Sequence, residues 1–244
     1  MISVKKNFLF VHMPKTGGNS LQTILQRYSE DERIVRGRQD GINRFAIENT
    51  SYATKKHSTL SEYKAALPPV LYDSLFKFAV IRNPWERMVS MYFSSNQRTW
   101  NREAFKKLAE ATLSLRRFIV LDSPIQNVLK KLKFRHERDG KPHLGIDLES
   151  ISRRVKFPVD SGKKKLTDDI DYLLRFEILN KEFKLLCKQL DIPHMPLPKV
   201  NVSERKHYTQ YYDEELKQLV GRKFTEEIEF GKYQFGDADT RLIG

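Results

Sequence analysis

The residues from His12 to Ser20 have the types and spacing of a loop that binds a phosphate-like group. They read His-Met-Pro-Lys-Thr-Gly-Gly-Asn-Ser. Gly17 and Gly18 would let the backbone come close to a ligand, and Lys15 adds a positive charge. Two hydroxyl groups could donate hydrogen bonds, those of Thr16 and Ser20. The segment therefore predicts an anion-binding loop.

The flanking elements would place this loop at the start of a helix. The apolar run Phe8–His12 predicts a strand, and a period of three to four residues predicts a helix over Ser20–Ser29. The apolar face of this helix would contain Leu21, Ile24, Leu25 and Tyr28. The helix dipole favours an anion near the first exposed N–H groups, those of Asn19, Ser20 and Leu21.

The order of lysine and glycine differs from that of a Walker A loop. A Walker A loop has its lysine after the second glycine, followed by a Ser or Thr that binds magnesium, whereas Lys15 precedes both glycines. A lysine in this place could reach the bridging oxygen of a bound phosphoanhydride as well as its terminal oxygens. The plain alternative is an ordinary turn from strand to helix with a surface lysine.

A second strand–loop–helix segment, Phe76–Tyr92, carries further groups for an anion. Arg82 ends the predicted strand Phe76–Arg82, and Ser90 lies in the predicted helix Pro84–Phe93. An arginine can hold a phosphate through two parallel hydrogen bonds, and a serine hydroxyl can add another. Ligands of open α/β sheets lie beyond the carboxyl ends of the strands. If the two strands are parallel neighbours, Arg82 and Ser90 share the side of the first loop, which suggests a ligand with two separated phosphate-like groups.

The helix after Arg82 would bury one face and present another. The predicted core face consists of Trp85, Met88, Val89 and Tyr92. Arg87 and Ser90 would project elsewhere. The alternative for Arg82 and Arg87 is that they only pair with nearby acids such as Glu86.

The remaining pattern is that of an α/β protein. A third apolar run, Tyr172–Phe176, predicts another strand, and near-continuous apolar strands are typical of a mainly parallel sheet with helices on both faces. Further helices are predicted from Arg102 to about Leu132 with breaks, at Asn180–Leu190 and at Asp213–Glu229. The single cysteine, Cys187, should be a buried core thiol.

The length of 244 residues suits one domain with insertions. Residues 130–165 are basic and rich in turn formers, which predicts an insertion or a substrate-facing region; a solvated charged surface is the alternative. The prolines of Ile192–Pro198 predict an extended connection.

The composition indicates a soluble globular protein with anionic partners. Hydrophobic residues make up 39% and charged residues 31%, and the formal net charge is +13. Such a charge suits a nucleotide, an acidic glycan, nucleic acid or a membrane surface without choosing among them. No apolar run approaches the roughly 18 residues that cross a bilayer. We expect a cytoplasmic protein, with a Golgi-lumenal location only if a membrane anchor has been removed; the oligomeric state stays open.

The two segments together resemble the nucleotide-binding motifs of the carbohydrate sulfotransferases. The matching patterns are H-x-P-K-T-G-G and V-I-R-N-P-x-x-R-x-x-S-x-Y, and the similarity is greatest to the heparan and chondroitin sulfate O-sulfotransferases and their bacterial relatives. Further matches are Leu174-Arg175-Phe176-Glu177, Asn201-Val202-Ser203-Glu204-Arg205, Tyr211-Tyr212-Asp213 and Phe230-Gly231-Lys232-Tyr233. The resemblance implies a P-loop-like α/β fold of three layers. It also implies 3′-phosphoadenosine 5′-phosphosulfate (PAPS) as co-substrate and its 3′,5′-bisphosphate (PAP) as product.

The resemblance also assigns nucleotide contacts. Residues Lys15–Ser20 would bind the 5′-phosphosulfate, and Arg82 and Ser90 the 3′-phosphate. The chain departs from the common pattern at Asn19, where threonine is more usual, but asparagine presents the same backbone N–H. Arg205 or Lys206 could reach a nucleotide phosphate, with a plain surface loop as the alternative. The basic region at 130–165 has no counterpart that can be aligned.

Sulfuryl transfer requires that the acceptor hydroxyl lose its proton and that the leaving phosphate oxygen be stabilised. Lys15 would act at the leaving oxygen. We expect no metal, because the sulfuryl group carries less charge than a γ-phosphoryl group and no acidic metal cluster is apparent.

A histidine is the natural base, since its pKa lies near the working pH. His57, in Lys55-Lys56-His57-Ser58, stands where the glycosaminoglycan enzymes carry their catalytic histidine. Glu48 is the alternative base, if desolvated. His12 would shape the loop, and the weaker candidates are His136, His143, His194 and His207.

The predicted function is therefore PAPS-dependent sulfation of a hydroxyl on a carbohydrate (glycan or glycolipid), for which an anionic acceptor would suit the net charge of +13. A P-loop-type kinase is the alternative, weakened by the place of Lys15 and the lack of a magnesium carboxylate. A nucleic-acid binder would rest on charge alone, with no recognisable module, and nucleic acid is not expected as a partner.

Overall fold

A computed structural model describes residues 1–39, 42–94, 99–121, 164–198 and 205–237, without the side chains of residues 36–45. The chain divides into two units, residues 1–120 with 166–244, and residues 121–165. Nearly all of the second unit lies outside the described residues, as do His136 and His143. The prediction of one domain with a basic region at 130–165 stays a prediction.

The central sheet of the first unit has four strands in the order β1-β2-β6-β7. β2 (Phe8–Val11), β6 (Phe76–Ile81) and β7 (Tyr172–Arg175) are parallel, and β1 (Ile2–Ser3) pairs antiparallel with β2. The three predicted strands are confirmed, each ending one residue earlier than expected. The sheet is mainly parallel and flanked by helices, so the α/β fold class is confirmed.

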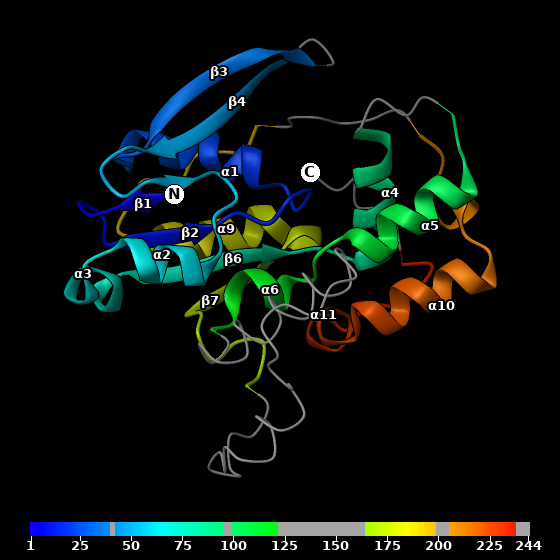
Figure 1. Ribbon diagram of the computed structural model, residues 1–244. Helices are drawn as coiled ribbons and strands as arrows, with labels where there is room; N and C mark the ends of the chain where they lie inside the picture. Colours follow the sequence, from blue (N-terminus) through cyan, green and yellow to red (C-terminus); the bar gives the residue numbers. More distant parts are fainter. Residues whose placement is uncertain (40–41, 95–98, 122–163, 199–204, 238–244) are drawn as a thin grey trace, which may run out of the picture. The chain divides into compact units, whose positions relative to one another are not determined.

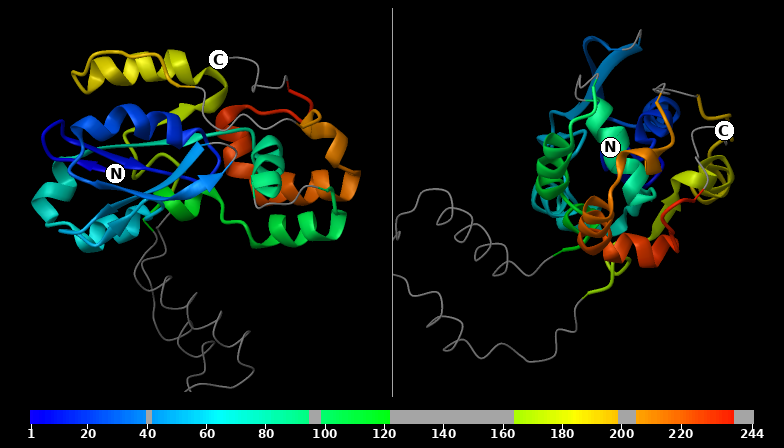
Figure 2. Two further views of the ribbon diagram at one scale, coloured as in Figure 1. Left: turned by 90° about the horizontal axis from the view of Figure 1, so that it is seen from above. Right: turned by 90° about the vertical axis from the view of Figure 1, so that its right-hand side faces the viewer.

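Helices cover both faces of this sheet. Figures 1 and 2 show α1 (Gly18–Leu25) and α9 (Leu179–Gln189) on one face, and α2 (Leu60–Ala66) with α6 (Leu115–Ile119) on the other. Side chains alternate between the faces of a strand. The core under α1 and α9 contains Phe8, Phe10, Leu21, Ile24, Leu25, Phe78, Val80, Leu174, Phe183, Leu186 and Cys187. The prediction of a buried Cys187 is thus confirmed.

A second sheet was not predicted. It is antiparallel, in the order β3-β4-β5, with β3 at Glu32–Gln39, β4 at Ile42–Asn49 and β5 at Thr54–Lys55. Its hairpin extends away from the central sheet in Figure 1. The many charged residues of β3 conceal the alternation that identifies a half-buried strand, and β5 is too short to show any pattern.

Helix α2 was missed as well, together with α3 (Pro69–Ser74). The start of α2 does carry a signal, a capping box in which the Thr59 hydroxyl and the Glu62 carboxylate each accept from the other residue's backbone N–H. This box fixes the backbone two residues after His57.

Beyond the carboxyl end of β6 lie α4 (Pro84–Ser94), α5 (Arg102–Ala111), α10 (Glu214–Lys223) and α11 (Thr225–Gly231). The segment Asp213–Glu229 was predicted as one continuous helix. That prediction was wrong, because the segment forms two helices, α10 and α11. The two helices meet at Phe224, whose φ of −116° and ψ of 32° are not helical. The Thr225 hydroxyl donates to the carbonyls of Gly221 and Arg222 at 3.0 Å each. Asp213 caps α10 by accepting from the Leu216 N–H at 2.8 Å.

Other boundaries also shift. Helix α1 ends at Leu25, followed by a 3₁₀ turn, and the helix expected from Arg102 breaks between α5 and α6, with its end beyond the described residues. Residues 192–198 form neither a helix nor a strand, in line with the predicted connection. The 3₁₀ turns are Gln26–Tyr28, Phe176–Ile178 and Tyr208–Tyr211.

The core face of α4 is as predicted, but Arg87 does not project away from the core. Its guanidinium lies 4.9 Å from the Phe224 ring centre, and the residue is 2% exposed. Burial lowers the pKa of Arg87 to about 10, while the nearby Glu227 carboxylate raises it. The aromatic ring and the carboxylate hold a cation where a helical wheel alone would place it near solvent.

None of the helices in the described ranges is long and apolar enough to span a membrane.

Replacing Gly221 in α10 should stabilise the protein. An added Cβ would meet only Trp85, at an ordinary 3.5 Å, and alanine reduces the conformational entropy of the unfolded chain. We expect Gly221→Ala to raise the free energy of unfolding by about 0.5–1 kcal/mol in urea denaturation. Gly18→Ala is the opposing control, because its Cβ would lie 2.1 Å from the buried His12 ring. A loss of stability in Gly221→Ala would contradict the packing described.

Candidate active site

The loop between β2 and α1 is shaped by two left-handed residues and two packed rings. Lys15 has a φ of 68° and Gly17, which caps α1, a φ of 79°. A Cβ on Gly17 would lie 2.8 Å from the Phe176 ring, and one on Gly18 would overlap the His12 ring. Gly17 is therefore required by its backbone and by Phe176, whereas Gly18 is required by His12.

The helix starts two residues earlier than predicted, which changes the exposed N–H groups. The Ser20 N–H donates to the Gly17 carbonyl at 3.1 Å, so it is used within the turn. Gly18 and Asn19 are the first two helical residues, whose N–H groups have no acceptor inside the helix. Among the described residues the helix start thus offers Gly18 and Asn19 to an anion.

Thr16 is part of the loop's interior. Its side chain is fully buried, and its hydroxyl donates to the Met13 carbonyl at 2.9 Å. This bond closes the turn that precedes Gly17. The predicted nucleotide contact of Thr16 stays a prediction. The hydroxyl hydrogen of Thr16 is already donated to the Met13 carbonyl within the loop.

Arg82 joins the second segment to the first. Its Nη1 donates to the Lys15 carbonyl at 3.0 Å, and its guanidinium lies 4.1 Å from the centre of the Phe176 ring. Its Nη2 and Nε donate to the Glu86 carboxylate at 2.7 and 3.4 Å. The expectation that Arg82 shares the side of the Lys15 loop is confirmed. Arg82 also pairs with Glu86, but the alternative that it only pairs with nearby acids was wrong.

Glu86 holds a second cation. Arg205 Nη2 lies 3.6 Å from Glu86 Oε1, and both side chains are 2% exposed. Ser90 follows Glu86 by one turn of α4, so the two side chains lie on one helix face. Arg82 and Arg205 thus meet at the buried Glu86 carboxylate, and Ser90 lies one turn further along the same helix face.

The motif at the end of β7 supports this arrangement. Glu177 accepts from the Asn83 N–H at 2.8 Å and from the Tyr233 hydroxyl at 2.8 Å. Burial raises the pKa of Glu177, which these hydrogen bonds and Arg82 oppose. Asn83 in turn caps α4 through its side-chain oxygen, which accepts from the Trp85 N–H at 3.1 Å. The motif residues of three distant segments therefore position the start of α4.

His57 lies beside the loop and is oriented by it. Its Nδ1 is 2.9 Å from the His12 carbonyl oxygen, and the two imidazole rings are 4.7 Å apart. A carbonyl only accepts, so Nδ1 must carry the proton and Nε2 the lone pair. His57 keeps an exposed surface. The geometry gives it the tautomer of a general base.

Both histidines are held toward their neutral forms. Burial lowers the pKa of His57, the bond to His12 opposes this, and Lys56 lowers the pKa further. The pKa of the buried His12 lies well below its usual value because of burial first and the charges of His57 and Lys56 next. His12 shapes the loop through ring packing and its carbonyl, as predicted from its position.

Lys56 and Arg33 belong to the site but were not singled out in the sequence. Lys56 is half-buried, and burial together with the charges of Arg33 and Lys15 lowers its pKa to about 8. Arg33 comes from β3, opposite Ile47 of β4. The pairing of β3, β4 and β5 brings Arg33 near Lys56. The sequence pattern did not predict this sheet.

The weaker candidates lie in different surroundings. Glu48 is on β4, in register with Glu32 and Lys55. His194 packs on Phe183, and His207 Nδ1 is 2.8 Å from the Thr209 hydroxyl. Within the described residues no group of three His, Cys, Asp or Glu side chains could hold a metal ion.

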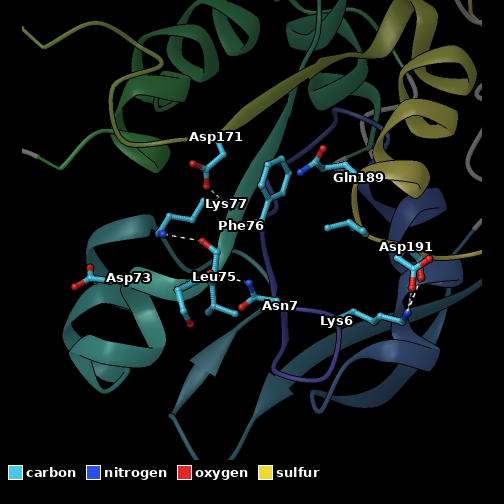
Figure 3. Close-up of a pocket in the computed structure, with 11 residues that line it drawn as sticks. Lys6, Asn7, Asp73, Leu75, Phe76, Lys77, Asp171, Gln189 and Asp191 are labelled. Atoms are coloured by element: carbon cyan, nitrogen blue, oxygen red, sulfur yellow. Dashed lines mark hydrogen bonds and ion pairs between the residues drawn. The ribbon is translucent and has the colours of Figure 1, made fainter.

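A cavity of about 370 Å³ lies at the opposite end of the sheet (Figure 3). Its lining includes Phe76 and Lys77 at the start of β6 and Asp171 just before β7. Lys77 and Asp171 bond within the wall, where the Lys77 N–H donates to Asp171 at 2.6 Å. None of the predicted site residues lines this cavity.

Comparison with known proteins identifies one family. A family model described as "Sulfotransferase family" matches residues 1–234, which include both strand–loop–helix segments and Tyr233. Searches of curated proteins and of solved structures gave no match.

The tautomer and pKa of His57 can be tested directly. Two-bond ¹H–¹⁵N NMR spectra should show a protonated Nδ1 and an unprotonated Nε2 at neutral pH, with a pKa below 6.5, the ordinary value. His207→Gln removes one other signal and aids assignment. A neutral His57 that is protonated on Nε2 would contradict the bond to His12, and a pKa above 6.5 would contradict the lowering by burial and by Lys56.

Proposed function

The chain belongs to the sulfotransferase family, and on this premise we propose that it transfers a sulfuryl group from PAPS to a carbohydrate hydroxyl. The family is PAPS-dependent, so the chain is a sulfotransferase and PAPS its co-substrate. The acceptor and the roles of single residues are our proposals. The observation that carries them is the 2.9 Å bond between His57 and the His12 carbonyl, because it ties a base to the anion loop.

The two anion sites suit the two ends of the nucleotide. The 5′-phosphosulfate would take the N–H groups of Gly18 and Asn19 and the charge of Lys15. The 3′-phosphate would take Arg82, Ser90 and Arg205. Arg82 has five N–H groups, of which three donate to Glu86 and the Lys15 carbonyl. The other two, one on each terminal nitrogen, have no acceptor among the described residues and would fit a phosphate.

The contacts of Arg82 and Arg205 support an anion at this second site. Both guanidiniums contact the buried Glu86 carboxylate. A phosphate beside the two guanidiniums would accept charged hydrogen bonds from them.

The transfer itself needs a base and a group that stabilises the leaving oxygen. His57 Nε2 takes the proton of the acceptor hydroxyl as its oxygen forms a bond to sulfur. The bond from sulfur to the bridging oxygen breaks, and the electron pair stays on the phosphate of PAP. Lys15 stabilises that oxygen as its charge develops. A lowered His57 pKa keeps the base neutral before the reaction.

An acceptor with a negative charge near the target hydroxyl fits best. Lys56 adds positive charge beside His57, and Arg33 of the second sheet adds positive charge beside Lys56. A basic cleft raises the local concentration of an anionic substrate. We therefore propose an acidic saccharide, in which a carboxylate or sulfate contacts Lys56.

Calorimetry with PAP, with ATP and magnesium, and with duplex DNA tests the nucleotide assignment. We expect PAP to bind and the other two to bind far more weakly. Binding of ATP with magnesium, without binding of PAP, would overturn the proposal in favour of a kinase. The acceptor is then sought by transfer of labelled sulfate to acidic and neutral saccharides.

Substitution of the base and of the lysine should separate their roles. His57→Ala should lower kcat by about 10²–10⁴-fold and leave PAP affinity unchanged, since it removes proton transfer alone. Lys15→Ala should lower both kcat and PAP affinity. Turnover and calorimetry measure the two effects, with His194→Ala as a control outside the site. Near-normal turnover in His57→Ala would reassign the base, and Glu48→Gln would then be the next variant.

The pH dependence of kcat/KM should be bell-shaped. Activity rises with pH as His57 loses its proton, with the rise below pH 6.5 because its pKa is lowered. Activity falls near pH 8, where Lys56 loses its charge. Lys56→Arg should move the upper limb to higher pH, since arginine stays protonated, while the lower limb stays. An unmoved upper limb would exclude Lys56 as its source.

A further inference from the structure

The contacts of Glu86 extend from one anion site to the other. Glu86 is 1% exposed and stands in the first turn of α4, where its N–H donates to the Asn83 side chain at 3.3 Å. Its carboxylate accepts two hydrogen bonds from Arg82. Arg82 in turn donates to the Lys15 carbonyl at 3.0 Å. A rigid helix start is thus connected through one guanidinium to the anion loop.

The carbonyl that Arg82 holds belongs to a strained residue. Lys15 has a φ of 68°, in the left-handed region that non-glycine side chains rarely adopt. Such a conformation persists only where its surroundings fix it. The described contacts that fix it are the bond from Arg82 and the Thr16 bond to Met13.

We propose that Glu86 is a positioning residue for the Lys15 loop. It holds the Arg82 guanidinium in the plane from which Nη1 reaches the Lys15 carbonyl, and so keeps Lys15, Gly18 and Asn19 aimed at one ligand. Arg82 is then shared by both ends of the nucleotide. The proposal rests on the function proposed above, which supplies PAPS as the ligand. It adds a role for Glu86 that sulfuryl transfer does not itself require.

Two other roles of Glu86 predict different outcomes. If Glu86 only balanced charge, Glu86→Gln would remove a negative charge and strengthen anion binding. If it only oriented Arg82 toward the 3′-phosphate, the variant would lose affinity for PAP and not for adenosine 5′-phosphate (AMP), which lacks that phosphate. A loop held through Arg82 requires that both ligands bind more weakly.

The experiment compares PAP and AMP binding by calorimetry in Glu86→Gln and in two controls. Ser90→Ala lies one turn along the same helix face and should weaken PAP alone. Glu215→Gln is the same exchange in a surface ion pair with Lys106 and should change neither. We expect Glu86→Gln to weaken PAP and AMP by a similar factor of about ten or more, as for a lost charged hydrogen bond.

Turnover with PAPS supplies a second readout. Glu86→Gln should lower kcat as well as raise KM, because the misplaced Lys15 no longer faces the leaving oxygen, whereas Ser90→Ala should mainly raise KM. Circular dichroism and the thermal midpoint establish folding. If Glu86→Gln does not fold, Arg82→Lys replaces it, since one ammonium cannot span Glu86 and the Lys15 carbonyl as the fork does.

In a folded Glu86→Gln variant, three results would overturn the proposal: an unchanged affinity for AMP, tighter binding of both ligands, or an unchanged kcat. Failure of the wild-type protein to bind PAP would instead refute the proposed function. The two failures are therefore distinguishable.

Discussion

The parallel pairing of β2 with β6 is the constraint on which the site depends. In this pairing Val11 lies opposite Ala79, so both strands end within two residues of each other at one edge of the sheet. Two chain segments that are far apart in sequence therefore leave the sheet side by side. The bond between Arg82 and the Lys15 carbonyl follows from that register. A shift by one residue would also turn the apolar side chains of β2 to the wrong face.

The balance of buried charge is the second condition of the site. Arg82, Arg205 and Glu86 occupy a region with little solvent, and desolvated ions need close partners with good geometry. Phe176 adds its ring face to Arg82, and Glu177 and Tyr233 brace the neighbouring backbone. These groups come from four parts of the chain, around residues 82–86, 176–177, 205 and 233. The far C-terminal segment thus contributes to a site whose loops lie near the N-terminus.

The sequence predicts the parallel strands and the two loops because their signals are local: apolar runs, glycines and helix periodicity. Lys15, His57, Arg82 and Ser90 were found through motifs. The structure joins Arg82 to the loop through the Lys15 carbonyl and His57 to the end of the preceding strand through the His12 carbonyl. The sequence could not predict that Arg33 and Lys56 are neighbours, because their proximity depends on the pairing of charged strands. Arg87 was misjudged for the related reason that its ring and carboxylate partners are remote in sequence.

The packing of His12 on Gly18 has a consequence for how this fold can diverge. Gly18 lies in a helix without a positive φ, so no backbone requirement demands glycine there. The demand comes from a ring whose atoms occupy the space of a Cβ. Positions 12 and 18 therefore share one volume, and a side chain can be added at one only if it is removed from the other. Relatives with a larger residue after the first glycine should accordingly carry a smaller one just after the first strand, where the backbone carbonyl alone can still orient His57.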